Sequence, residues 1–480
     1  MGRSVSRILG AISLFSGIRV LNIVCSLVRN KLFAVLVGPI GLGLLMLYNT
    51  TLDLVSIVTR MSMDQSAVRD IAREGSDAAG DTAVVVRRWS LWLGCGGMAL
   101  ILLLSPLLSY WMFDTTDKWW TLAILSPVAL CSSYGGAENA LMQGLGRLRR
   151  LVKSGAVAAV ASTVVAVALI WWLRESSVIP VILAASICMA VAAHFYRVRT
   201  ARSALAAREI IRRGRGFVKL GALMTLSAVV TQLMNYVFVL WLNHTGSTAD
   251  LGLYQAGYTI INTYVGVVLT GAWVEYYPHL SAVTHSRHRT SVLVAHECEL
   301  ALRILVPVVL GMIVLDGLMV RILYAERFLE MLPLVSIGII GVFFRATSWC
   351  MAFVILAKGD GAVYILTESL SAFLGLALNV LGYSLWRFEG LGVSYIVWYA
   401  LYTVITYVVY VRRYRLVWPR RLWLLLAVVT VCAVLTLCSK ILFRRGWLPS
   451  CPLSLRFRLC ARFCVRGLRL SSADTHKPVK

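Results

Sequence analysis

Charged residues are scarce in this chain of 480 residues: they make up 14% of the total, whereas 59% of the residues are hydrophobic. Soluble domains usually carry about 25% charged residues. About 20 consecutive apolar residues can cross the hydrocarbon core of a bilayer as a helix, and such runs follow one another along most of the chain. The shortage of charge therefore excludes a soluble globular protein and predicts a polytopic membrane protein.

Several motifs of soluble enzymes are missing as well. The sequence has no G-x-x-x-x-G-K-[ST] run, so no P-loop ATPase is fused to it, and neither H-E-x-x-H nor G-x-S-x-G occurs. The eleven cysteines lack the paired spacing of a zinc site. We expect no cofactor and no metal, and the short loops leave little room for a catalytic domain. Nothing in the sequence gives positive support to an enzyme.

Acidic residues are few, with 22 Asp and Glu against 47 Lys and Arg, and the formal net charge is +25. The cations gather in alternate loops, richest in 197–216, which is the pattern of the positive-inside rule with a cytoplasmic N-terminus. The basic excess therefore reflects membrane topology, and no nucleic-acid partner is expected. Arg29 and Lys31 are the exception, since they fall in the first predicted outer loop.

The apolar runs predict twelve transmembrane helices and a thirteenth candidate. Their approximate bounds are 8–28, 32–59, 89–112, 119–142, 154–173, 178–196, 217–242, 253–277, 300–324, 331–356, 362–386 and 390–411, followed by 422–443. The predicted domains are an N-terminal six-helix bundle (1–200), a basic cytoplasmic linker (201–216), a C-terminal six-helix bundle (217–411), an additional hydrophobic helix (412–443) and a basic tail (444–480). For the tail, an interfacial helix, a disordered segment and an abnormal end of the reading frame all stay open.

Three short triplets indicate an internal repeat. "LGA" at 9–11 recurs at 220–222, "LGL" at 42–44 at 251–253, and "SAV" at 66–68 at 281–283, with offsets of 211, 209 and 215. The order and the spacing are kept, and six helices per half make the repeats parallel. The predicted fold class is an all-α integral membrane protein with two parallel-repeat six-helix bundles around a central cavity.

Polar residues recur on single faces of several predicted helices, at spacings of three and four. They are Arg19, Asn22, Ser26 and Arg29 in the first, Asn49, Asp53, Ser56 and Arg60 in the second, and Gln255, Thr259 and Asn262 in the eighth. Hydrogen bonds between helices would explain the neutral residues. An arginine in mid-membrane costs about 2.5–3.5 kcal/mol, which favours a hydrated cavity around Arg19 and, second, around Arg345.

Two acidic residues are candidates for proton or sodium coupling, namely Glu138 and Glu368, because each interrupts an apolar run.

The stretches "RNKLFAVLVGPIGLGLLMLYNT" (29–50), "QSAVRDIA" (65–72) and "LGLYQAGYTIINTYVGVVL" (251–269) with "EYYPHLSAV" (275–283) resemble Wzx-type O-antigen flippases. These belong to the multidrug/oligosaccharidyl-lipid/polysaccharide exporter superfamily. The resemblance covers about residues 5–411. It implies two bundles that alternate between inward-open and outward-open states in the bacterial inner membrane, and an undecaprenyl-diphosphate-linked oligosaccharide as substrate.

The implied substrate gives the polar residues roles, which we assign by charge and helix face. Arg19, Arg345 and Arg29 are expected to hold the diphosphate, since the planar guanidinium binds phosphate bidentately. The sugars would contact Asn22, Asn49, Asp53, Tyr48, Gln255, Tyr258, Asn262 and Tyr264. Membrane lipids, a polysaccharide polymerase and chain-length machinery are the further partners considered. The alternatives are a cation-coupled drug exporter or a peptidoglycan-precursor flippase of the same fold, and a membrane O-antigen polymerase or ligase.

Overall fold

The computed structural model describes residues 21–60, 63–198, 207–266, 276–277 and 279–444. Most of these residues are helical and none lies in a β-strand, which confirms the predicted all-α class. After a first helix at 21–36, the elements are α2 (Pro39–Arg60), α3 (Met63–Phe113), α4 (Trp119–Leu125), α5 (Pro127–Gly144), α6 (Leu148–Leu173), η1 (Arg174–Ser177), α7 (Val178–Tyr196), α8 (Ala207–Thr245), α9 (Thr248–Thr259), η2 (Ile260–Tyr264), α11 (Arg287–Leu323), η3 (Glu326–Met331), α12 (Leu332–Gly338), α13 (Gly341–Ala357), α14 (Gly361–Val408), η4 (Val409–Arg413) and α15 (Arg420–Arg444).

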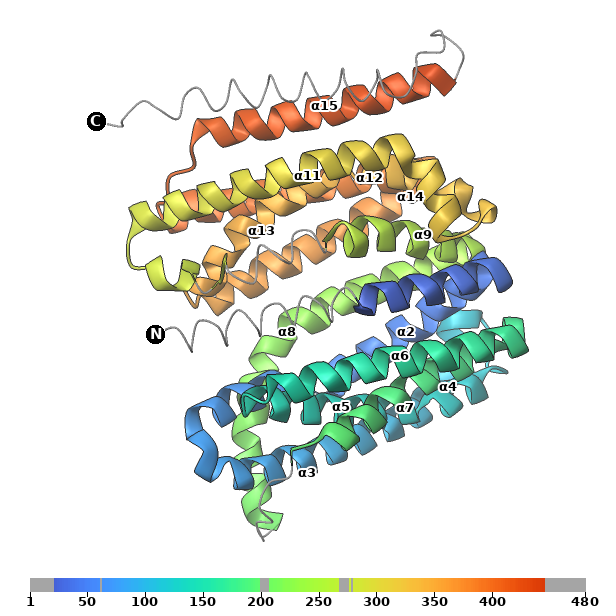
Figure 1. Cartoon of the computed structure of the whole chain (residues 1–480), viewed down its shortest axis with the longest axis vertical. Coiled ribbons are helices and arrows are strands. Elements are labelled where there is room, and N and C mark those ends of the chain that lie inside the picture. Colours follow the sequence, from blue (N-terminus) through green and yellow to red (C-terminus); the bar gives the residue numbers. More distant parts are fainter. Residues whose placement is uncertain (1–20, 61–62, 199–206, 267–275, 278, 445–480) are drawn as a thin grey trace. The chain divides into compact units, whose positions relative to one another are not determined.

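The chain divides into two compact units. Unit 1 comprises Met1–Gln255 with Leu323–Arg327, and unit 2 comprises Ala256–Ile322 with Phe328–Lys480. In unit 1, α3 packs on α5 and α6 packs on α7 (Figure 1). In unit 2, α14 packs on α12 and α13, and α15 contacts α13. Because α8 packs on α2 and α3, it belongs to unit 1 by its contacts, although the sequence places most of it after the linker.

Seven of the described helical stretches are long and apolar enough to cross a membrane. Two of them, Leu148–Tyr196 and Gly361–Arg413, each contain two predicted segments, so the seven account for nine of the thirteen. The pair Glu326–Gly338 and Gly341–Ala357, bent by 53°, corresponds to a tenth. Segment 119–142 is split between α4 and α5 at Pro127, and 8–28 and 253–277 extend beyond the described residues. The protein is a multi-pass membrane protein.

The turn after the first helix lies later than the sequence predicts. The expected loop at Arg29 and Lys31 is wrong, because the helix continues through both residues to position 36. Gly38 then adopts φ 84°, which glycine tolerates, and Pro39 begins α2, where proline's fixed φ is favourable. The Lys31 ammonium donates a hydrogen bond to the carbonyl oxygen of Tyr324. The two cations are therefore helix residues.

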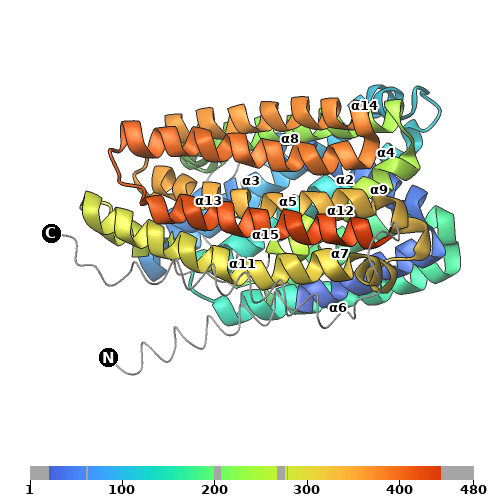
Figure 2. The ribbon, with the colours of Figure 1, turned by 90° about the horizontal axis from the view of Figure 1, so that it is seen from above.

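Two pairs of unusual backbone conformations recur at one offset. Gly146 and Gly359 have φ 66° and 72°, and Arg174 and Arg387 have φ 45° and 47°, in both cases 213 residues apart. Positive φ is rare in residues other than glycine. Arg174 closes the turn between α6 and α7, and Arg387 the turn between the two arms of α14, which run side by side (Figure 2). These matched turns support the repeat.

The recurring "LGL" triplets meet each other within unit 1. A Cβ on Gly43 would lie 1.9 Å from the carbonyl oxygen of Thr248, and a Cβ on Gly252 would lie 1.9 Å from that of Pro39. Both partners are four residues before the opposite glycine, so each segment makes the same contact with the other. Such reciprocity is what a local two-fold axis between equivalent segments produces. Only glycine permits this approach of α2 to α9.

Candidate functional site

Arg345 lies in the interior of unit 2 on α13, with 8% of its surface exposed. Its Nη1 donates to the Oδ1 of Asn262 and, at 3.4 Å, to the hydroxyl of Tyr395. That hydroxyl also donates to the Asn262 Oδ1, at 2.9 Å. The three side chains come from α13, η2 and α14, so the cluster connects three separate elements of the unit.

Aromatic rings surround the guanidinium group. Its Cζ lies 4.4 Å from the ring centroid of Trp349 and 5.9 Å from that of Tyr399. The rings of Tyr395 and Tyr399 lie 4.8 Å apart. Cations are attracted to the faces of aromatic rings within about 6 Å. The rings stabilise the charge of Arg345 without neutralising it.

Arg345 has no carboxylate partner among the residues that the structure describes, and its buried Nε has no hydrogen-bond partner there. Burying an unpaired charge is costly, and ionisable residues inside a membrane protein are functional-site candidates by default. The Nε edge of the guanidinium is half of the fork that binds a phosphate or carboxylate with two parallel hydrogen bonds. Chemically, the cluster is suited to an anion.

Asn262 lies in a π-helical segment, η2, which interrupts the helix that begins with α9. Its Nδ2 donates to the carbonyl oxygen of Tyr258 at 3.2 Å. Such segments occur mostly as single turns within α-helices, often at functional sites. The sequence predicts a regular helix here, and the prediction is wrong over Ile260–Tyr264, because α-helical periodicity does not reveal one extra residue per turn. The predicted sugar-contacting residues Tyr258 and Tyr264 of unit 2 are half-buried. Gln255, which belongs to unit 1, is half-buried as well.

The predicted site residues of unit 1 differ in how exposed their side chains are. Asn22, Asn49 and Asp53 are exposed within the unit, and Arg29 is half-buried. Tyr48 points the other way, since it is buried and its hydroxyl donates to the Thr121 Oγ1 at 3.0 Å. Arg19 lies outside the described residues.

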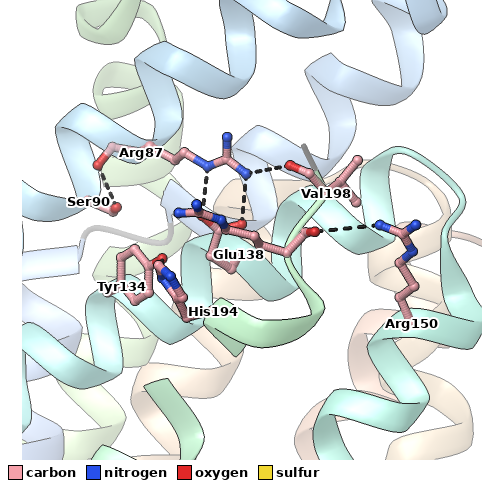
Figure 3. A network of polar contacts seen from close by, with 8 residues as sticks. Arg87, Ser90, Tyr134, Glu138, Arg150, His194 and Val198 are labelled. Atoms are coloured by element: carbon pink, nitrogen blue, oxygen red, sulfur yellow. Dashed lines mark hydrogen bonds and ion pairs between the residues drawn. The ribbon is translucent and has the colours of Figure 1, made fainter. Parts of the chain in front are cut away.

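Glu138 of α5 is fully buried and is paired with Arg87 of α3 (Figure 3). The Arg87 Nε lies 2.6 Å from Oε1, and the Nη2 lies 3.0 Å from Oε2 and 2.7 Å from the carbonyl oxygen of Val198. Beside this pair, the Tyr134 hydroxyl lies 2.7 Å from the His194 Nδ1. The bidentate pair neutralises the carboxylate that the sequence singles out for ion coupling.

Glu368, the second coupling candidate, accepts a hydrogen bond from the hydroxyl of Tyr402 between the two arms of α14. It is half-buried, and it is not ion-paired within the described part of the chain.

Sequence reasoning missed the aromatic residues that surround Arg345. Tyr395, Tyr399 and Tyr402 recur at spacings of four and three in the twelfth predicted segment, so they share one helix face. This row of tyrosines on one helix face is the sequence feature from which an aromatic site could have been predicted. Trp349, four residues after Arg345 on the same helix, was a second one.

The comparisons with known proteins agree with this architecture. Residues 32–333, more than half of the chain, match the family model described as polysaccharide biosynthesis protein. No curated protein matches the chain in sequence. Among solved structures, the chain is similar to the lipid II flippase MurJ in an inward closed conformation (TM-score 0.69, 13% identity), with 97% of this chain and 98% of that chain covered.

Two further solved structures, both of MOP superfamily transporters, are similar to the chain. An inward-facing multidrug resistance MATE family transporter has a TM-score of 0.69 at 11% identity, covering 83% of this chain and 98% of that one. A MOP superfamily transporter from Pyrococcus furiosus has a TM-score of 0.60 at 14% identity, covering 84% and 95%. The resemblance to Wzx-type proteins is confirmed. This chain is a member of the polysaccharide biosynthesis protein family, and it has the membrane transporter fold of the MOP superfamily.

Proposed function

We propose that the protein is a flippase that moves an undecaprenyl-diphosphate-linked oligosaccharide, an O-antigen or related surface polysaccharide repeat unit, across the bacterial inner membrane. The N-terminus lies in the cytoplasm, and the two halves alternate access to a central cavity. The observation that carries the proposal is Arg345, a buried arginine that no described carboxylate neutralises.

The chemistry of Arg345 fits a diphosphate. An arginine that faces an amide, hydroxyls and aromatic rings keeps its full charge for a ligand, and its fork matches phosphate oxygens. A carrier of cationic drugs would need an acidic centre at this place. Arg29 and Arg19 are proposed to make further phosphate contacts as the headgroup moves.

The sugars are proposed to contact the exposed polar residues of unit 1 and the cluster around η2. Asn22, Asn49 and Asp53 present amide and carboxylate groups to sugar hydroxyls. In unit 2, Tyr258 and Asn262 lie next to Arg345 in the same network, so a sugar attached to the bound diphosphate would meet them first. The lipid tail stays in the bilayer.

Glu368 is the residue proposed to couple transport to protons or sodium. Its one described hydrogen bond comes from a neutral hydroxyl, so the carboxylate can gain or lose a proton without breaking an ion pair. Glu138 would have to break two hydrogen bonds to Arg87 to do the same. A polysaccharide polymerase and its chain-length machinery are proposed to act on the translocated product.

The test is complementation of a strain from which the gene has been deleted. The deletion is expected to leave lipid-linked repeat units on the cytoplasmic side and to remove the surface polysaccharide. Arg345→Gln keeps a polar side chain with hydrogen-bond donors and removes its charge. We expect it to lower flipping at least tenfold at equal protein levels, since charge-assisted hydrogen bonds contribute about 1.5–3 kcal/mol.

Arg303→Gln is the matched control, because Arg303 lies on α11 in the same unit but is exposed and bound to Glu299. It should complement fully. Full activity of Arg345→Gln would remove the basis of the phosphate assignment. If deletion instead caused lysis without loss of surface polysaccharide, the substrate would be a peptidoglycan precursor.

A further inference from the structure

A separate basic pocket lies in unit 1, at one end of the α5–α6–α7 group. Its volume is about 580 Å³, and it is lined by Arg147, Arg150, Phe195, Tyr196, Arg197 and Val198. The chain leaves α5 after Gly144, turns through Gly146 and enters α6, while α7 ends at Tyr196 beside this turn. The pocket therefore forms where two helix ends and one helix start meet.

The lining carries three arginines and no acidic residue. The nearby carboxylate of Glu138 is paired with Arg87 and not with an arginine of the pocket (Figure 3). Arg87 also donates a hydrogen bond to the carbonyl oxygen of Val198. The Arg150 Nη1 is 3.5 Å from the Arg197 carbonyl oxygen, which is the limit of hydrogen bonding. Among the residues that the structure describes, no carboxylate therefore lines the pocket or pairs with its arginines.

The repeat provides an internal comparison for this pocket. Gly146 and Gly359 occupy equivalent turns, 213 residues apart, so Arg147 corresponds to Asp360. In unit 2, Asp360 accepts a hydrogen bond from the Arg413 Nε at 2.7 Å and from the Tyr414 hydroxyl at 3.2 Å. The same turn therefore accommodates an acid that neutralises a neighbouring arginine. Unit 1 has an arginine in its place.

The position of the pocket along the helices places it at a membrane surface. α6 has 26 residues and is about 39 Å long at 1.5 Å per residue, against about 30 Å for the hydrocarbon core. Its far end carries Trp171 and Trp172, which are 69% and 89% exposed, as is typical of a membrane interface. At the pocket end, Phe195 is 80% exposed beside the arginines. An apolar ring next to guanidinium groups matches a lipid headgroup and its first acyl carbons.

The start of α6 adds to the attraction for an anion. No side chain caps its first turn, and the positive end of the helix dipole lies at the pocket. We propose that this pocket binds the phosphate group of an anionic membrane lipid, on the side of the membrane that the charge pattern predicts to be cytoplasmic. It is distinct from the Arg345 cluster, and it does not depend on what the protein transports.

The experiment uses the full-length protein, purified in detergent and titrated with phosphatidylglycerol or phosphatidylcholine, with bound lipids counted by native mass spectrometry. We expect one phosphatidylglycerol to bind more tightly than any phosphatidylcholine. The double variant Arg147→Gln, Arg150→Gln should weaken that binding at least tenfold, as expected for the loss of charge-assisted hydrogen bonds. Arg147→Asp, which copies unit 2, should weaken it at least as much.

Arg149→Gln is the matched control, since Arg149 is exposed on the same turn of α6 but does not line the pocket. It should change the affinity by less than about twofold. An equal loss in Arg149→Gln would show a general charge effect and overturn the proposal. In a parallel arm, inorganic phosphate alone is added. Displacement of the lipid by millimolar phosphate would assign the pocket to a soluble phosphate and overturn the lipid assignment.

Discussion

Unit 1 pairs the half-buried Arg87 with the buried carboxylate of Glu138, whereas unit 2 buries Arg345 against Asn262, Tyr395 and aromatic rings. At the equivalent surface turns, it is unit 2 that has the ion pair and unit 1 that has the arginines without one. Unit 2 pairs Arg413 with Asp360, and unit 1 leaves arginines around a pocket without an acid. Of these four sites, each unit thus contributes one whose arginine is paired with a carboxylate and one whose arginines keep their charge.

The difference separates structural arginines from arginines that can serve a ligand. In a buried ion pair, the attraction between the two charges compensates for their lost hydration, so the pair needs no ligand. An arginine that is held by neutral groups keeps its attraction for an anion, at a cost in stability. The repeat makes this difference informative, since the same architecture accommodates both arrangements. Which one occurs at a given place is determined by a few residues.

The largest expected effect comes from breaking the neutralised core pair. Arg87→Ala leaves the Glu138 carboxylate unpaired, with 1% of its side chain exposed. Loss of one partner of a buried pair costs about 3–5 kcal/mol of unfolding free energy. Denaturant unfolding of the detergent-purified protein would measure it. Glu138→Gln should cost less, because the side chain of Arg87 is 24% exposed and retains the Val198 carbonyl oxygen.

Arg345→Met is the counterpart of this experiment in unit 2. It leaves no carboxylate unpaired among the described residues, and Tyr395 and Asn262 keep the hydrogen bond that joins them. We expect a change in unfolding free energy of at most about 1.5 kcal/mol, because the apolar side chain of Met replaces a buried charge that costs free energy in the folded protein. If Arg345→Met were as destabilising as Arg87→Ala, the distinction between the two sites would be lost.

An effect smaller than that of Arg87→Ala tests the equivalence of the halves. Gly43→Ala and Gly252→Ala each place a methyl group 1.9 Å from a carbonyl oxygen of the opposite helix. Overpacking of this kind costs about 1–3 kcal/mol. The two single variants should be destabilised equally, because their contacts are reciprocal. Gly96→Ala in α3 is the control, since a Cβ there meets nothing within 4 Å, and it should not destabilise the protein. Clearly unequal costs at Gly43 and Gly252 would argue against the local two-fold axis.

Much of the fold was predictable because helix formation in a membrane follows from long apolar runs. The segments at 89–112, 154–173 and 422–443 fall within described helices. The boundaries were less accessible. Arg29 and Lys31 are polar enough to suggest a loop, yet the turn is set by Gly38 and Pro39. The π-helical segment at Asn262 leaves no mark in the periodicity.

The site was predictable where a single charge stands out, as Arg345 does in an apolar run. Its partners were not, because they come from segments far apart in the sequence, and only the packing within unit 2 brings Asn262 and Tyr395 to it. Glu138 is likewise a single charge in an apolar run, but the structure pairs it with Arg87. The sequence places Arg87 in a loop, before the predicted segment 89–112. Sequence shows that a charge is buried, but its counter-ion depends on tertiary contacts.

The smallest expected effect concerns the neutralised surface pair. The hydrogen bond from Arg413 holds the pKa of the Asp360 carboxyl below its ordinary value of about 3.9. A lowered pKa in the folded state stabilises the protein above the ordinary pKa, and this contribution is lost as the pH falls through the folded value. Arg413 is 56% exposed, so at pH 7 Asp360→Asn should cost less than about 1 kcal/mol of unfolding free energy.

The pH dependence distinguishes this pair from the equivalent turn of unit 1. The difference in unfolding free energy between the wild type and Asp360→Asn should shrink as the pH is lowered from 7 to about 3, because the wild-type carboxyl is then increasingly protonated. Arg147→Gln removes a charge that has no carboxylate partner in the pocket, so its difference from the wild type should stay constant over the same range. A constant difference for Asp360→Asn would mean that the Asp360 carboxylate does not stabilise the folded protein. The turns at Arg147 and Asp360 would then differ in sequence but not in their contribution to stability.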